Sequence, residues 1–162
     1  MIENAAKLPE MEPVMVEHKE LKLIGIPCIG LNDMGGKYRH AKEALLSSAK
    51  HLPHIVNPHI HYGLWPHGPS QSHPDTHVYI LCMEVESYDD IPEWFLRLTV
   101  PAHRCVVVAN KDGNFEAAGQ AVEAYLREKG LQKSAGDRTY TICERYNYEG
   151  EGFARYSLPL VD

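Results

Sequence analysis

The order of apolar and polar positions predicts strands interleaved with two helices. Residues 14–29 are predicted to be extended, and a glycine pair then leads into a helix over residues 37–52. Pro53 ends this helix, because proline cannot continue a helical hydrogen-bond ladder. Strands at 59–65 and 77–85 follow, and a loop rich in Pro, Gly and Ser separates them.

The second half of the chain repeats this order. Residues 94–100 alternate in polarity and the apolar run HRCVVVAN follows, which predicts a strand or a strand pair. Asn114 is a candidate N-cap for a helix over residues 115–129, and Gly130 lies at its C-terminal end. Two last strands are predicted at TYTICERYNY and GFARYSLPLV.

Each half therefore contains strand, helix, strand and strand, and short segments agree between halves, such as KLIGIPC with RCVVVAN. We expect one domain over residues 1–162, with one repeat at about 13–90 and a second at about 91–162. The predicted fold class is α+β, with duplicated βαββ repeats about a pseudo-twofold axis and antiparallel sheets flanked by two helices. A ligand cleft is expected between the repeats, because pockets favour such junctions.

Composition narrows the classes of partner. The chain has 16 Lys and Arg against 22 Asp and Glu, a formal net charge of -6, with no basic run. This balance argues against direct nucleic-acid binding and suits a cationic small molecule. No apolar stretch reaches the roughly 20 residues of a membrane span, so we expect a soluble, cytoplasmic protein without a membrane partner. The four cysteines are scattered singly, as expected of buried reduced thiols.

One predicted strand carries a carboxylate in an aromatic row. At a period of two, one face of TYTICERYNY presents Tyr140, Ile142, Glu144, Tyr146 and Tyr148. An ionised Glu144 among apolar neighbours must find a partner, take up a proton or wait for a ligand that supplies the missing charge. In the alternative interpretation, the strand lies at a sheet edge and Glu144 is hydrated among half-exposed tyrosines.

Several of these segments together resemble a known family. The duplicated βαββ order, LTVPAHRCVVVANKDG and the closing ICERYNYEG and FARYSLPLV are similar to the GyrI-like, or bacterial effector-binding, domain found with AraC-type and MerR-type regulators. The resemblance covers residues 11–162. Residues 1–13 are too short for a helix-turn-helix module, so a stand-alone form is expected.

The resemblance implies a cleft between the repeats that takes up lipophilic, often cationic, aromatic compounds. The family places a glutamate of the penultimate strand at its floor, and Glu144 matches that position, with Tyr146 beside it. Alternation rather than the resemblance suggests the walls, although aromatic residues at strand spacing are more often part of a core. These candidate wall residues are Tyr62, Trp65, Tyr79, Trp94 and Tyr140.

Three functions stay open. The first is binding and sequestration of such compounds, without a cofactor. The second is hydrolysis of strained electrophilic cyclopropane compounds, an activity of some free-standing members of the family, with Glu144 as the catalytic residue. A third, inhibition of DNA gyrase through protein contacts, is implied by other members, and no particular residue of this chain favours it.

A histidine-rich segment offers a different class of site. Seven of the ten histidines lie between His51 and His77, and His59 and His61 are predicted to share a strand face. His67, His73 and His77 are the candidates to complete a metal site from the loop. The segment lacks HExxH and paired carboxylates, so solvated loop histidines and no metal site are expected.

Overall fold

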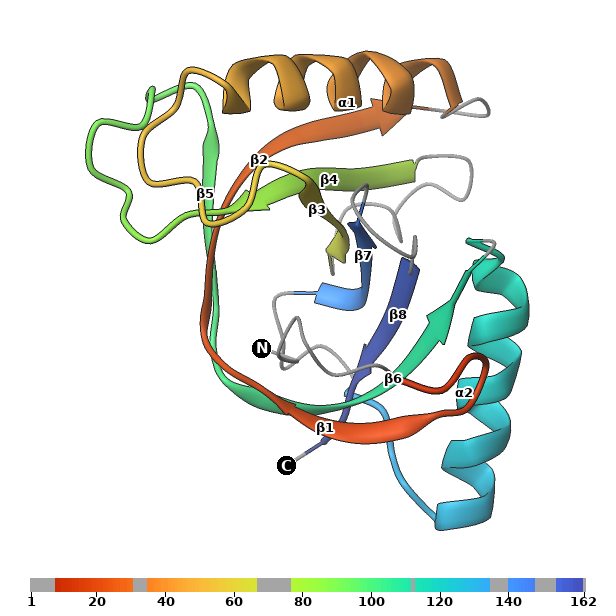
Figure 1. The fold of residues 1–162 in the computed structure, drawn as a ribbon. Coiled ribbons are helices and arrows are strands. Elements are labelled where there is room, and N and C mark those ends of the chain that lie inside the picture. Colours follow the sequence, from red (N-terminus) through yellow and green to blue (C-terminus); the bar gives the residue numbers. More distant parts are fainter. Residues whose placement is uncertain are drawn as a thin grey trace.

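The computed structural model of the 162-residue chain describes residues 8–30, 35–66, 77–111, 113–134, 140–147 and 154–161. Figure 1 shows a strongly curled sheet with two helices on its outer side. The elements in chain order are β1 (Val14–His18), β2 (Leu21–Gly30), α1 (Gly35–Ala49), β3 (Ile60–Pro66), β4 (His77–Glu84), β5 (Leu96–Val100), β6 (His103–Asn110), α2 (Phe115–Lys129), β7 (Tyr140–Asn147) and β8 (Ala154–Pro159).

Local sequence signals explain where α2 begins and ends. The Asn114 side chain accepts a hydrogen bond of 3.1 Å from the backbone N–H of Ala117, which satisfies one of the free donors of the first turn. Gly130 follows the helix with a φ of 64°, the left-handed conformation that glycine adopts without strain. Both helix ends agree with the predicted span. The other helix, α1, begins and ends earlier than the predicted 37–52.

The eight strands of the described ranges form one antiparallel sheet in the order β1-β6-β8-β7-β3-β4-β2-β5. The strands β1, β2, β3 and β4 of the first half correspond to β5, β6, β7 and β8 of the second. When each strand is exchanged for its counterpart, the order reads the same from the opposite edge. The halves are therefore related by a pseudo-twofold axis between β3 and β7. The α+β fold class with duplicated repeats is confirmed. Each half has one more strand than βαββ, and a single sheet replaces the separate sheets that were predicted.

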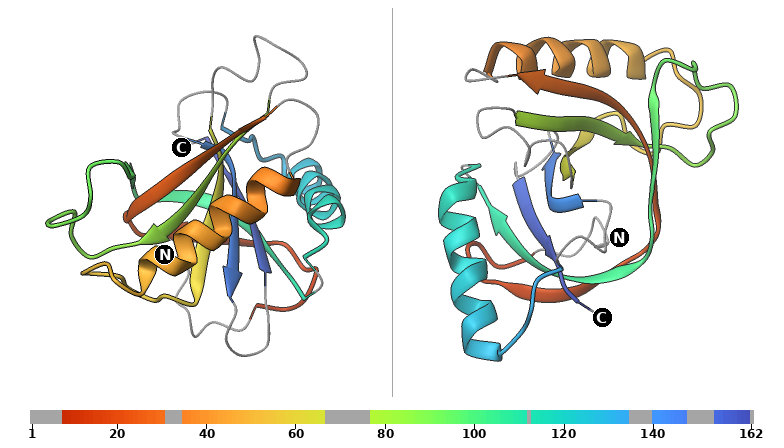
Figure 2. Two further views of the ribbon diagram at one scale, coloured as in Figure 1. Left: turned by 90° about the horizontal axis from the view of Figure 1, so that it is seen from above. Right: turned by 180° about the vertical axis from the view of Figure 1, so that it is seen from behind.

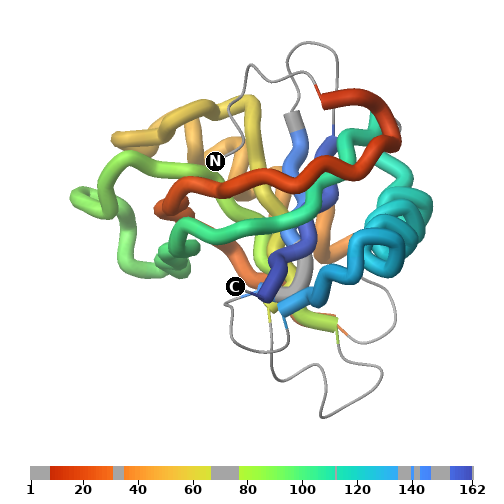
Figure 3. The backbone as a smooth tube through the Cα atoms, turned by 90° about the horizontal axis from the view of Figure 1, so that it is seen from below, coloured from red at the N-terminus to blue at the C-terminus, as the bar shows by residue number. Residues whose placement is uncertain are grey.

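The extra strands arise where the predicted segment 14–29 divides into β1 and β2. The first strand of each half pairs with the second strand of the other half: β1 with β6, and β5 with β2. His18 lies opposite His103 and Leu21 lies opposite Val100, so the same register continues through both pairings. In the tube of Figure 3, the segment of β1 and β2 runs beside the segment of β5 and β6. This exchange joins the halves at the sheet edges.

Both helices cover the outer face of the curl, as Figure 2 shows from two directions. Apolar stripes hold them there: α1 buries Ala41, Leu45 and Ala49, and α2 buries Ala118, Val122 and Leu126. The inner face has its own cluster, which includes Tyr62, Leu64 and Cys143. Neither described helix has the length and apolar composition that a membrane crossing requires. The central strands β3 and β7 pass between the two helix-covered regions and can carry a site there.

Candidate functional site

Glu144 lies on β7 at the centre of the sheet, directly opposite Gly63 of β3. Its side chain is 8% exposed and accepts three hydrogen bonds. The carboxylate oxygen Oε2 accepts from Tyr79 Oη at 2.6 Å and Tyr146 Oη at 3.1 Å, and Oε1 accepts from Trp65 Nε1 at 3.3 Å. Three hydrogen-bond donors therefore converge on one buried carboxylate.

An aromatic pocket of about 240 Å³ opens above this carboxylate. Trp65 and Tyr79 meet edge to face, with ring centroids 5.0 Å apart, and Tyr38 tilts against Tyr79 at 6.0 Å. Gly35, the first residue of α1, and Tyr38 bring the helix to the rim. The pocket is therefore an aromatic slot with a carboxylate at its floor, lined by Gly35, Tyr38, Trp65, Tyr79 and Glu144.

A second row of rings holds Tyr146 in position. The fully buried His61 stacks on it with centroids 4.5 Å apart and 9° between the planes. From the other half, Phe115 of α2 meets the Tyr146 ring edge to face at 5.4 Å. Tyr38 Oη lies 3.5 Å from His61 Nε2, at the limit of a hydrogen bond. Burial, with a smaller contribution from Lys42, lowers the pKa of His61 to about 3, so this ring is neutral.

Two tyrosine hydroxyls beside Glu144 keep their protons. Burial, followed by the charge of Glu144, raises the pKa of Tyr79 and of Tyr146 well above the usual range, so both phenols remain donors. Among the described residues, no Lys, Arg or His forms an ion pair with Glu144. The site can thus attract a cation and surround it with ring faces.

The structure brings together four of the seven residues that the sequence suggested. Glu144, Tyr79 and Trp65 line the pocket, and Tyr146 donates to the carboxylate from beside it. These residues come from β7, β4 and β3, three adjacent strands near the sheet centre, so side chains far apart in sequence converge on one outer face.

Tyr62 and Tyr140 require a correction, because both belong to the inner face. On β3, Tyr62 lies on the opposite face from Trp65, and its hydroxyl donates to Glu84 Oε2 at 3.5 Å. Tyr140 is displaced by a bulge: Trp65 pairs with Ile142 but the next residue of β3 pairs with Tyr140, which shifts the alternation by one. Tyr140 then lies 2.5 Å from Nε2 of His103 on the inner side.

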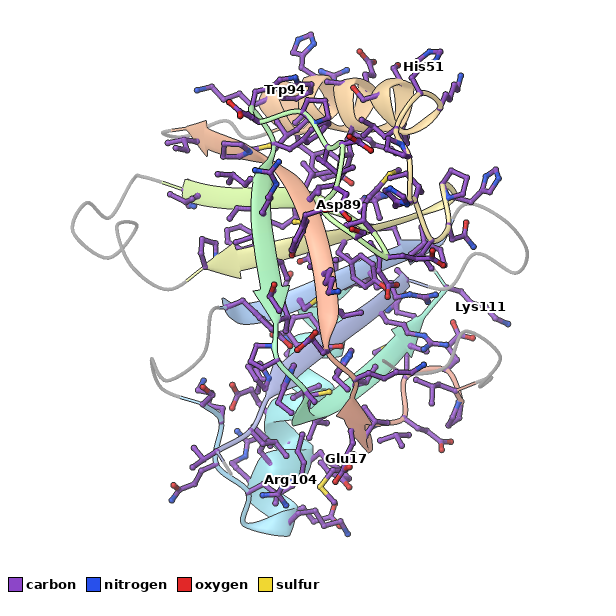
Figure 4. All side chains as sticks on the ribbon, turned by 90° about the vertical axis from the view of Figure 1, so that its left-hand side faces the viewer. Glu17, His51, Asp89, Trp94, Arg104 and Lys111 are labelled. Carbon is purple, nitrogen blue, oxygen red and sulfur yellow. The ribbon has the colours of Figure 1, made fainter. Side chains whose placement is uncertain are left out.

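Trp94 also requires a correction. The predicted strand 94–100 begins only at Leu96, so Trp94 lies in the loop before β5, as Figure 4 shows. Its side chain is 63% exposed and stacks on Phe95 with centroids 3.9 Å apart. Strand alternation does not apply to a loop, and this ring lies outside the pocket lining.

The sequence analysis missed Gly35, Tyr38, His61 and Gly63. An isolated glycine in a strand often marks a close approach of another group, so Gly63 within IHYGLW carried a usable signal. His61 shares the face of Trp65 on β3, which alternation could have shown. Tyr38 lies one turn before the buried Ala41 and Leu45 of α1, and no local signal distinguishes a core tyrosine from one at a pocket rim.

The histidine-rich segment gives no metal site within the described residues, where no three His, Cys, Asp or Glu side chains are close enough to hold an ion. His59 is exposed just before β3, whereas His61 is buried beneath Tyr146. His51 projects from the far end of the α1 region in Figure 4. His67 and His73 lie outside the described residues.

A family model described as "Cass2: Integron-associated effector binding protein" matches residues 15–158. A search of curated proteins with the chain found no match. Among solved structures, the EcmrR C-terminal domain has a TM-score of 0.69 at 13% identity, over 93% of this chain and 98% of that one. In the EcmrR–DNA complex, the match spans 57% of the longer EcmrR chain.

Two other solved structures share the fold. SAV2435 bound to tetraphenylphosphonium has a TM-score of 0.65 at 14% identity, over 93% of this chain and 94% of that one. The integron cassette protein VCH_CASS2 from Vibrio cholerae has a TM-score of 0.58 at 15% identity, over 93% and 96%. At these identities the likeness concerns the fold, and the choice of ligand must be argued from the residues of the pocket.

Proposed function

The chain belongs to the family of integron-associated effector binding proteins, and we propose that it binds small lipophilic cations that carry an aromatic group, in the pocket above Glu144. The observation that carries this proposal is the buried carboxylate itself. It accepts three hydrogen bonds from neutral donors, and no described cationic side chain pairs with it.

A ligand cation supplies the charge that this site lacks. Hydrogen bonds from Tyr79, Tyr146 and Trp65 spread the negative charge of Glu144 but do not neutralise it. In a medium less polar than water, the attraction between a cation and this carboxylate is several times stronger than at the surface. Ring faces add to it, at about 0.5 to 2 kcal/mol for each cation–π contact.

The size and lining of the pocket restrict the ligand. A volume of about 240 Å³ lies below the roughly 300 to 1,000 Å³ of typical drug-sized sites, so the slot takes one aromatic ring or one cationic head, and the rest of a larger cation such as tetraphenylphosphonium stays at the rim. Both oxygens of Glu144 already accept hydrogen bonds. The relative SAV2435, which was solved with tetraphenylphosphonium, supports a cation of this kind.

Replacement of Glu144 by glutamine tests the proposal. Glu144→Gln keeps the shape of the side chain and removes its charge, so we expect tetraphenylphosphonium to bind roughly 30-fold more weakly, a loss of about 2 kcal/mol. Isothermal titration measures this difference. Glu84→Gln is the matched control, since Glu84 is a half-buried carboxylate that accepts from Tyr62 on the inner face. Equal affinities of wild type and Glu144→Gln would rule out the charge as the basis of binding.

The charge also predicts a preference between isosteric ligands. Trimethylanilinium and tert-butylbenzene have the same shape, and only the first is a cation. The wild type should prefer trimethylanilinium, and Glu144→Gln should lose most of that preference, because only the electrostatic part of the affinity depends on the carboxylate.

A second candidate function is hydrolysis of strained cyclopropane compounds in the same slot. The specific observation is that Tyr79 Oη and Trp65 Nε1 converge on the Glu144 carboxylate beside an apolar ring pocket. Glu144 would accept the proton of an attacking water while the electrons of the broken ring bond pass into a conjugated carbonyl of the substrate. Chromatography of such a compound after incubation separates the candidates, since binding alone returns it unchanged.

A further inference from the structure

Tyr79 and Glu144 hydrogen-bond across an intervening strand. Tyr79 belongs to β4 and Glu144 to β7, and β3 runs between them. Strands two places apart in a sheet are separated by about 10 Å, so the tyrosine ring must pass over β3 to reach the carboxylate. The position on β3 beneath this bond is Gly63, which pairs with Leu81 of β4 on one side and with Glu144 on the other.

The space above Gly63 is fully occupied by the Tyr79 ring. A Cβ atom added at Gly63 would lie 1.5 Å from Tyr79 Oη, 2.2 Å from Cζ and 2.9 Å from Cε2. Real Cβ atoms do not approach other atoms so closely, and a phenol ring cannot bend to give way. Gly63 is also absent from the described glycines with positive φ, which are Gly113 and Gly130. Space for the ring, rather than backbone conformation, therefore requires glycine here.

We propose that Gly63 is the positioning residue of this pocket: its bare face lets Tyr79 lie across β3, donate to Glu144 and leave the slot above open. Any larger residue lifts the ring off the sheet. The outer side of the sheet is where Tyr38 and Trp65 stand, both in contact with Tyr79, so a lifted ring moves into the pocket volume. The inference rests on the proposed function in one respect, that the slot is where the cation binds.

The test is a double-mutant cycle between Gly63→Ala and Tyr79→Ala. With tetraphenylphosphonium as probe, Gly63→Ala should weaken binding roughly 10-fold in the wild-type background, because the hydrogen bond to the carboxylate is lost and the slot narrows. In the Tyr79→Ala background the same methyl meets no ring, so its effect should fall below about 2-fold. Equal effects in both backgrounds would overturn the proposal, as would unchanged affinity in Gly63→Ala.

Gly25→Ala is the matched control for adding a methyl to a buried strand glycine. Its Cβ would lie 2.8 Å from Ile80 Cγ2 and 2.9 Å from Cys82 Sγ, in the part of the sheet away from Glu144. This variant should lower the urea midpoint of unfolding and leave the affinity for tetraphenylphosphonium unchanged. A loss of affinity equal to that of Gly63→Ala would show a general effect on the sheet, against the proposal.

The same double-mutant cycle can also be measured without a ligand, through the urea midpoint of unfolding. Gly63→Ala should lower the urea midpoint in the wild-type background and leave it nearly unchanged in the Tyr79→Ala background, because only the ring is displaced. If wild type and Glu144→Gln both fail to bind the cation, the proposed function fails while this coupling can still hold. If the midpoints show no coupling, the role of Gly63 fails whatever the binding data show.

Discussion

The two halves of the molecule place different residues at the same point of the fold. Each half has a helix of 15 residues after its second strand, and the first residue is Gly35 in α1 and Phe115 in α2. Gly35 lines the pocket. Phe115 instead packs against Tyr146 at 5.4 Å and near Tyr156 at 6.3 Å. The two equivalent helix starts therefore differ: Gly35 borders an open pocket, whereas Phe115 fills its place with a packed ring.

The last strand of each half, β4 in the first and β8 in the second, carries a tyrosine, and these two tyrosines also differ in where their rings pack. Tyr79 on β4 reaches toward the sheet centre, over Gly63, and ends at Glu144. Tyr156 on β8 pairs directly with Glu144 along the backbone, yet its ring packs with α2 in the core cluster of the second half. The first half therefore supplies most of the pocket walls, and the second half supplies the charge.

The largest expected effect comes from removing the difference at the helix starts. Gly35→Phe puts a large ring at the pocket rim and should weaken tetraphenylphosphonium binding by up to roughly 100-fold, because overpacking costs about 1 to 3 kcal/mol. Titration calorimetry measures the loss. Gly36→Phe is the control, since a Cβ at Gly36 meets no atom within 4 Å. Comparable losses in both variants would mean that a bulky helix start, and not filling of the pocket, is responsible.

The reverse change removes the ring from the second half. Phe115→Ala should lower the free energy of unfolding by about 2.5 kcal/mol, somewhat below the value for a fully buried phenylalanine, because Phe115 is half-buried against Tyr146. Urea unfolding gives the value, with Phe115→Leu as the milder comparison. A change smaller than that of Phe115→Leu would show that this ring does not hold Tyr146.

The other support of Tyr146 comes from the first half and depends on pH. His61 has a pKa of about 3 in the folded protein and about 6.5 when unfolded, so between these values only the unfolded chain binds the proton. Stability therefore falls as pH drops below 6.5, by about 1.4 kcal/mol for each pH unit. His61→Phe keeps a stacked ring and should remove about 2 kcal/mol of the loss between pH 7 and pH 5.

Urea unfolding at both pH values measures this difference. His18, on the inner face, also has its pKa lowered to about 3, mainly by burial, so the variant should keep the part of the acid sensitivity that His18 causes. An unchanged pH dependence in His61→Phe would mean that His61 binds its proton equally well in the folded and unfolded states, against the lowered pKa.

Local sequence signals predicted the helices and strands better than they predicted which face of the sheet each side chain occupies. The span of α2 followed from Asn114 and Gly130, because caps are encoded within a few residues. Tyr140 was placed on the wrong face because a bulge in β7 depends on its pairing with β3, which no single segment contains. Trp94 was misplaced because its strand begins two residues later. Tyr38 joins the pocket only through the packing of α1 on the sheet.

The exchange of first strands suggests an origin for this asymmetry. A half-length ancestor consisting of β1 to β4 would direct its first strand away from its own β2, where only a second copy could pair with it. Two identical copies would then have carried the same residue at both helix starts. Gene duplication and fusion would make the exchange intramolecular, and each copy could thereafter change by itself. A single chain could then carry glycine at the start of α1 and phenylalanine at the start of α2.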